Sequence, residues 1–154
     1  MSQKAVTNST CLIGLERIDR LDLLPQVFEV VFAPPTVAME VQRKLNWLRV
    51  QSVKNKSVIA TLKTQMDEGE AETIALAMEL DDIILILDDK KARRVAQQIG
   101  LKVIGTVGML LRAKTQGVIP EIRPLLIALL QVDFRISNAI VQEALRLAGE
   151  GNLT

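Results

Sequence analysis

The sequence predicts an α/β fold, a three-layer sandwich whose central, mostly parallel sheet has 4–5 strands and is followed by C-terminal helices. Two observations predict it. Apolar segments typical of strands alternate with helical segments along the chain, which favours parallel pairing. The segment 83–87 holds five consecutive apolar residues, as expected of a strand buried on both faces. We interpret residues 1–154 as one domain, with a helical extension from about residue 120 to 154.

The N-terminal half contains the less regular elements. A first strand covers Ala5–Val6, and a polar loop follows at 7–10. Short helices are predicted at 11–15 and 21–24, the second ending near Pro25. The β-branched and aromatic run 27–32 predicts a buried strand. A helix then starts at the Pro34–Pro35 pair, with apolar residues at helical spacing as far as Leu48, and a half-exposed strand is predicted at 50–53.

The C-terminal half has clearer patterns. Good helix formers at 70–80 precede the strand at 83–87. A basic helix at 90–99 is closed by Gly100, and a short strand covers 101–104. Three more helices are predicted, at 106–116, 121–131 and 137–148.

Composition excludes several classes of function. The chain has no histidine, which removes histidine-based acid–base catalysis and most zinc sites. Its one cysteine, Cys11, cannot form an intrachain disulfide. The net charge of +1 is too small for a protein that coats duplex nucleic acid. The longest uncharged run is too short to span a bilayer, so we expect a cytoplasmic protein without a membrane partner.

Two polar clusters fall at the carboxyl ends of predicted strands, where parallel sheets form their sites. One is the run 7–10, and the other is Asp88–Asp89. Further acids come from helices: Glu40, Glu70 and Glu72. Carboxylates gathered without histidine suit Mg²⁺ or Mn²⁺. Spacing alone leaves other readings open, because Asp88–Asp89 also suit a helix cap, Glu70 and Glu72 suit a helix dipole, and Glu40 suits a solvated surface.

Four cations directly follow the second cluster: Lys90, Lys91, Arg93 and Arg94. Beside an acidic metal site they would hold the backbone of RNA. Away from such a site they would form an ordinary solvated helix face.

Three segments together resemble the PIN-domain family, in its branch of VapC-like toxin ribonucleases. They are GEAETIALA at 69–77, LILDDKKARRVA at 85–96 and GLKVIGTVGMLLRAK at 100–114. Parts of the tail from Gly117 to Leu145 fit the same branch, so the resemblance covers nearly the whole chain.

The resemblance implies a Mg²⁺- or Mn²⁺-dependent endoribonuclease, the toxin of a toxin–antitoxin pair. The family's acids fall on Asn8, Glu40, Glu70 and Asp89, with Glu72 as the alternative to Glu70 and with Asp88 beside Asp89. Ser9 or Thr10 carries the hydroxyl that the family places next to the metal. Ser9, with the four cations, is expected to contact RNA. The implied partners are RNA, a cognate antitoxin and a second copy of the chain.

Asn8 departs from the family pattern, which has an aspartate at this position. An amide offers a metal one neutral oxygen and accepts no proton, so the shell loses about one negative charge. Two functions follow: a ribonuclease of weakened activity, or a catalytically impaired module that binds an antitoxin or RNA.

Overall fold

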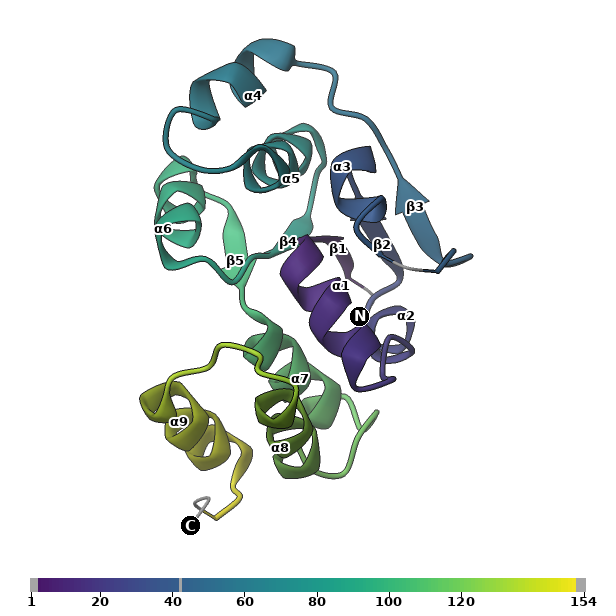
Figure 1. Cartoon of the computed structure of the whole chain (residues 1–154), viewed down its shortest axis with the longest axis vertical. Helices are drawn as coiled ribbons and strands as arrows, with labels where there is room; N and C mark the ends of the chain where they lie inside the picture. The colour runs from purple at the N-terminus through teal and green to yellow at the C-terminus, as the bar shows by residue number, and fades with distance from the viewer. Residues whose placement is uncertain (1–2, 42, 152–154) are drawn as a thin grey trace.

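The computed structural model describes residues 3–41 and 43–151, so residues 1, 2, 42 and 152–154 of the predicted domain lie outside the described residues. Five strands form one parallel sheet in the order β3-β2-β1-β4-β5 (Figure 1). The strands are β1 (Lys4–Thr7), β2 (Val30–Ala33), β3 (Leu48–Val50), β4 (Ile83–Ile86) and β5 (Lys102–Ile104). The predicted α/β class and strand number are confirmed.

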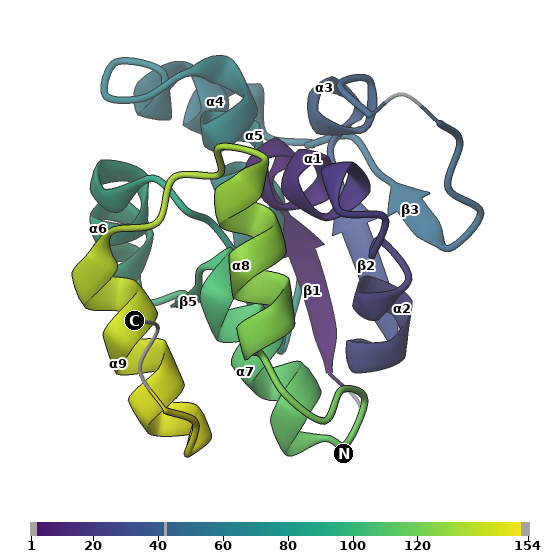
Figure 2. The same cartoon turned by 60° about the horizontal axis from the view of Figure 1, so that its bottom comes forward.

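Helices cover both faces of the sheet. In chain order they are α1 (Ser9–Arg17), α2 (Leu23–Val27), α3 (Pro35–Ala38), α4 (Lys56–Leu62), α5 (Glu68–Glu79), α6 (Lys90–Ile99), α7 (Thr106–Thr115), α8 (Arg123–Gln131) and α9 (Asn138–Ala148). Figure 2 shows α7, α8 and α9 grouped together, with α8 and α9 forming the C-terminal helices that the sequence predicts. No described helix is both long and apolar enough to cross a bilayer.

The interior strand β4, which lies between β1 and β5, divides its side chains between two cores. Ile84 and Ile86 pack into the core that also contains α1, α2, α7, α8 and α9. Ile83 and Leu85 pack into the core built with α4, α5 and α6. Because successive side chains of a strand point to opposite faces, an unbroken apolar run satisfies both cores at once. The predicted three-layer arrangement follows from this alternation.

The predicted loop at 7–10 is wrong, because α1 begins at Ser9 directly after β1. Asn8 is the reason. Its side-chain oxygen accepts a hydrogen bond from the backbone N–H of Cys11 at 3.0 Å, so it caps the helix within one residue of the strand. The polar residues that suggested a loop therefore form a tight strand-to-helix junction.

Two boundaries in the next segment also differ from prediction. Pro25 lies inside α2 rather than ending it, since the first turn of a helix does not need the missing N–H, and the following strand β2 begins at Val30. The long helix predicted up to Leu48 is limited to α3. Leu48 instead pairs with Val31 as the first residue of β3, because sheet pairing outweighs the helical spacing of the apolar residues.

Candidate functional site

The candidate site lies at the carboxyl edge of the sheet, where β1 and β4 are neighbours. From β1 the chain proceeds outward to β2 and β3, and then crosses to β4 on the other side. Such a switch point leaves a crevice between the loops that follow the two strands. Thr7 pairs with Ile86, and the backbone N–H of Asn8 donates to the carbonyl of Ile86 at 3.1 Å, so the two predicted polar clusters are side by side.

Asn8 is buried, with 4% of its surface exposed, and both ends of its amide are engaged. Its oxygen caps α1, and its Nδ2 donates to Oδ2 of Asp88 at 3.2 Å. The side chain thus ties the end of β1 to the end of β4. Its N–H partly compensates the negative charge of Asp88.

Asp88 is held by a second partner as well. Its Oδ1 accepts the backbone N–H of Thr106 at 2.8 Å, and its Oδ2 accepts the Thr106 hydroxyl at 2.8 Å. Because the N-cap of α7 is Gly105, which has no side chain to cap the helix, Asp88 performs that task from β4. The hydrogen bonds of Asp88 therefore connect β1, β4 and α7.

A pocket of about 310 Å³, here called the acid pocket, opens beside Asn8. Its carboxylates come from α3 and α5 and the residues next to them: Glu40, Asp67, Glu68 and Glu70. Its remaining lining residues are Asn8, Ser9, Thr10, Thr36 and Gly69. No Lys or Arg is among the described lining residues, so the pocket attracts a cation.

Glu70 is fixed by a capping box at the start of α5. Its backbone N–H donates to Oδ1 of Asp67 at 2.8 Å, and its Oε1 accepts the backbone N–H of Asp67 at 3.3 Å. Burial, together with the charges of Asp67 and Asp89, raises the pKa of Glu70 to about 7. The surroundings therefore disfavour the ionised carboxylate, and a cation bound beside it would favour that form.

Glu40 approaches the same place from the residues after α3. A Cβ added at Gly69 would lie 3.9 Å from Oε1 of Glu40 and 3.7 Å from Oδ1 of Asp67. The carboxylates of Glu40 and Asp67 therefore both lie near the first turn of α5.

The other predicted acids have different positions. Asp89 is the N-cap of α6, where its Oδ2 accepts the backbone N–H of Ala92 at 2.9 Å, and it is close enough to Glu70 to influence its pKa. Glu72 does not line the acid pocket, because two residues along a helix turn a side chain to another face. Its Oε2 is buried and has no hydrogen-bond partner among the described residues.

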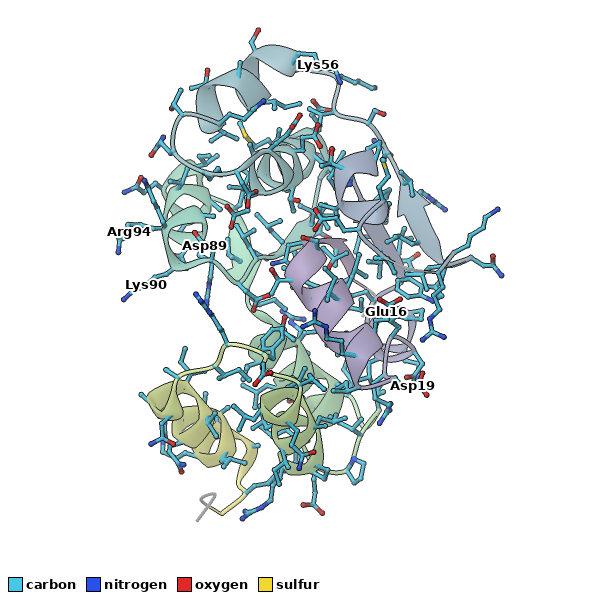
Figure 3. The ribbon with its side chains drawn as sticks, in the orientation of Figure 1. Glu16, Asp19, Lys56, Asp89, Lys90 and Arg94 are labelled. Carbon is cyan, nitrogen blue, oxygen red and sulfur yellow. The ribbon has the colours of Figure 1, made fainter. Side chains whose placement is uncertain are left out.

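The four predicted cations divide into two groups. Lys90, Lys91 and Arg94 are exposed, and Figure 3 shows Lys90 and Arg94 pointing outward from α6. Arg93 is half-buried and lines a second cavity together with Asp88.

The donor atoms of the acid pocket are of the type that a hard divalent cation binds. All of them are oxygens, from carboxylates, an amide and hydroxyls, which is the set that Mg²⁺ and Mn²⁺ prefer. Within residues 3–41 and 43–151, no three Asp, Glu, His or Cys residues lie close enough to hold an ion by themselves. Water ligands would therefore complete the coordination of an ion bound here.

Sequence reasoning missed four residues of the site: Thr36, Asp67, Glu68 and Thr106. Asp67 had a detectable signal, since an Asp three residues before Glu70 at the start of an apolar helix is a capping box. Thr36 and Thr106 carry no such local signal, because their roles depend on contacts between distant segments.

Comparison with known proteins places this geometry in a family. No curated protein matches the chain. Residues 4–150, nearly its full length, match the family model described as the PIN domain. With its parallel sheet and its carboxylates gathered at the β1/β4 edge, the chain belongs to the PIN-domain family.

Proposed function

We propose that this protein is a Mg²⁺- or Mn²⁺-dependent endoribonuclease of the VapC-like branch, with activity weakened by Asn8. PIN domains form a nuclease-like superfamily, generally use divalent metal ions and commonly bind RNA. The observation that carries the proposal is the acid pocket, which gathers carboxylates at the switch point of the sheet without a lining cation.

Each acid receives a distinct task in this proposal. Glu40, from the residues after α3, and Glu70, from the first turn of α5, would hold the ion, and Asp89 would add charge from the start of α6. When bound, such an ion lowers the pKa of a water molecule and stabilises the charge that develops on a phosphodiester. Ser9 places a hydroxyl at the same pocket. The hydrogen bonds of Asp88 with Asn8 and Thr106 hold the ends of β1 and β4 and the start of α7 together.

Attraction for RNA would come from α6. Because the acid pocket repels phosphate, cations are needed near its rim, and the exposed side chains of Lys90, Lys91 and Arg94 meet this need. Arg93, which is half-buried beside Asp88, would contact the strand closest to the acids.

The biological setting is proposed from the family. PIN domains often pair with antitoxins, so we propose a cognate antitoxin, a homodimer and a cytoplasmic location. A small reading frame directly upstream of the gene would support the antitoxin, and light scattering of the purified chain tests the dimer. A protein that stays monomeric at all concentrations would contradict the proposed homodimer.

A second candidate function is a catalytically impaired binding module. It is favoured by the amide of Asn8, whose N–H already satisfies Asp88 where the family has a carboxylate. With this contact in place the end of β1 contributes less charge to a cation. Binding of RNA or of an antitoxin would then be the remaining activity.

Cleavage of a labelled single-stranded RNA tests both candidates. The chain and its Asn8→Asp variant are compared with Mn²⁺ and with a chelator, and Glu40→Gln serves as the ligand-loss control. We expect slow cleavage by the chain, faster cleavage by Asn8→Asp and none with chelator or in Glu40→Gln. Cleavage by Asn8→Asp alone would establish the binding module, and cleavage that survives both chelator and Glu40→Gln would refute the proposed site.

A further inference from the structure

A second cavity of about 450 Å³, here called the apolar groove, lies between β5, α7 and α9. These elements are close in the fold, with α9 packed alongside α7 near the edge strand (Figure 2). Apolar side chains form most of its walls, among them Val103, Val107, Leu111, Ile136 and Leu147. Its size falls within the range of pockets that bind small ligands.

The apolar groove adjoins the proposed catalytic site. Asp88 lines the groove and Asn8 lines the acid pocket, and the two side chains are joined by a hydrogen bond of 3.2 Å. The two cavities thus lie on either side of one contact, at the carboxyl ends of β1 and β4. A flexible ligand crossing that contact can occupy both.

Cations distinguish the groove from the acid pocket. Arg93 and Arg135 line the groove, whereas no described residue lining the acid pocket is a Lys or Arg. Asp88 and Glu143 also line the groove, but Asp88 is bound by Asn8 and Thr106, and Glu143 pairs with Arg146. Among the described residues neither Arg93 nor Arg135 has an ion-pair partner, so the two guanidinium groups are available to a ligand. Gly105 lies beneath Arg93, since a Cβ there would be 3.5 Å from its Nη1 and 3.1 Å from Oδ1 of Asp88. The guanidinium of Arg93 is therefore positioned at the end of the groove that borders the site.

We propose that the apolar groove is a subsite for one nucleobase of single-stranded RNA, next to the phosphate held at Arg93. The proposal rests on the proposed function and identifies the part of the substrate that the protein recognises. A base has an apolar face that suits the groove walls, and its phosphate suits the guanidinium groups of Arg93 and Arg135. An apolar peptide would fill the walls but would leave the two cations at the groove without partners, so charge complementarity favours the nucleotide.

The test measures binding by fluorescence anisotropy, with chelator present to prevent cleavage. The probes are a labelled single-stranded RNA and an oligonucleotide of equal length that lacks bases. We expect about tenfold tighter binding of the RNA that carries bases. Ala139→Trp fills the groove from the exposed start of α9, and it should remove most of this preference. Ala60→Trp, at an exposed position on α4, is the matched control and should retain it.

A second pair of variants tests the cation. Arg93→Gln should weaken binding of both probes more than Lys91→Gln does, because Lys91 carries the same charge on the same helix but does not line the groove. Thermal melting of each variant checks that it folds. Equal binding of the two probes by the wild-type chain, or a preference unchanged by Ala139→Trp, would overturn the base subsite and would leave the groove to a protein partner.

The experiments distinguish a failure of the base subsite from a failure of the proposed nuclease function. Glu40→Gln should abolish cleavage while keeping the preference for bases, because it lies in the acid pocket and not in the groove. A preference for bases in a chain that never cleaves RNA would support the subsite and refute the nuclease. Cleavage by a chain that binds both probes equally would support the nuclease and refute the subsite.

Discussion

Replacing Asn8 by Asp tests the central electrostatic argument, because the change places a second carboxylate beside Asp88. The amide nitrogen that now donates to Oδ2 of Asp88 lies 3.2 Å from it, in a side chain that is only 4% exposed. Two unit charges at that separation repel by about 5 kcal/mol at an effective dielectric constant of about 20. The cap of α1 survives, since Asp and Asn are equally good N-caps.

The expected loss of stability is smaller than the full repulsion. Side-chain rotation and entry of water reduce it, and we expect about 2–4 kcal/mol in the presence of chelator. For a chain of this size that corresponds to a fall in Tm of about 5–15 °C. A divalent cation between the two carboxylates should restore most of the loss, because it replaces repulsion by shared attraction.

Thermal unfolding by circular dichroism, with chelator or with Mn²⁺, measures both effects. Asn8→Ala is the first control: it loses the cap and the hydrogen bond without adding charge, so Mn²⁺ should raise its lower Tm no more than it raises that of the wild type. The double variant Asn8→Asp with Asp88→Asn is the second control, since it exchanges donor and acceptor and should recover stability without a metal. An Asn8→Asp variant that melts like the wild type in chelator would refute the reasoning.

Three further predictions concern the support of the site. Glu150 should stabilise the chain only above acidic pH. Burial opposes its charge, but hydrogen bonds from backbone N–H groups and from Lys114 hold its pKa below the ordinary 4.5. The free energies of unfolding of Glu150→Gln and wild type, measured in urea, should therefore differ at pH 7 and converge as the pH falls through that lowered pKa. Gly105→Ala should reduce nucleic-acid binding and lower Tm, because the new Cβ would press on Asp88 at 3.1 Å; a melting curve and RNA affinity equal to those of the wild type would contradict this. Glu79→Gln should lower the free energy of unfolding in urea by about 1–2 kcal/mol, since the Glu79 carboxylate accepts backbone N–H groups at the start of α4. An unchanged urea midpoint would show that water replaces the carboxylate as the acceptor.

The agreement between prediction and structure is best where a segment needs no distant partner to define it. The apolar run at 83–87 predicts β4 because burial on both faces requires apolar residues at every position. The helix after Gly69 and the basic helix ended by Gly100 were likewise predicted from local signals, namely propensity and a residue able to adopt a positive φ, here 101°.

Prediction was poorer where tertiary contacts compete with local preference. Leu48 has helical spacing from Leu45, but pairing with Val31 places it in β3. The polar run after β1 resembles a loop, but the cap formed by Asn8 makes it the start of a helix. A periodic pattern reveals neither deciding partner: strand β2 pairs with the segment that begins at Leu48, and the amide oxygen of Asn8 caps α1.

The chemistry available to this protein follows from its residues alone: oxygen donors without histidine, polar clusters after two strands, and cations that follow one of them. How these groups divide between sites depends on the packing of the elements. Glu40 and Glu70 face one pocket because α3 packs against α5, whereas Asp88 turns to Thr106 and Asn8. Residues adjacent in sequence leave a strand or helix in different directions, so which carboxylates meet depends on how the elements pack and not on their order in the chain.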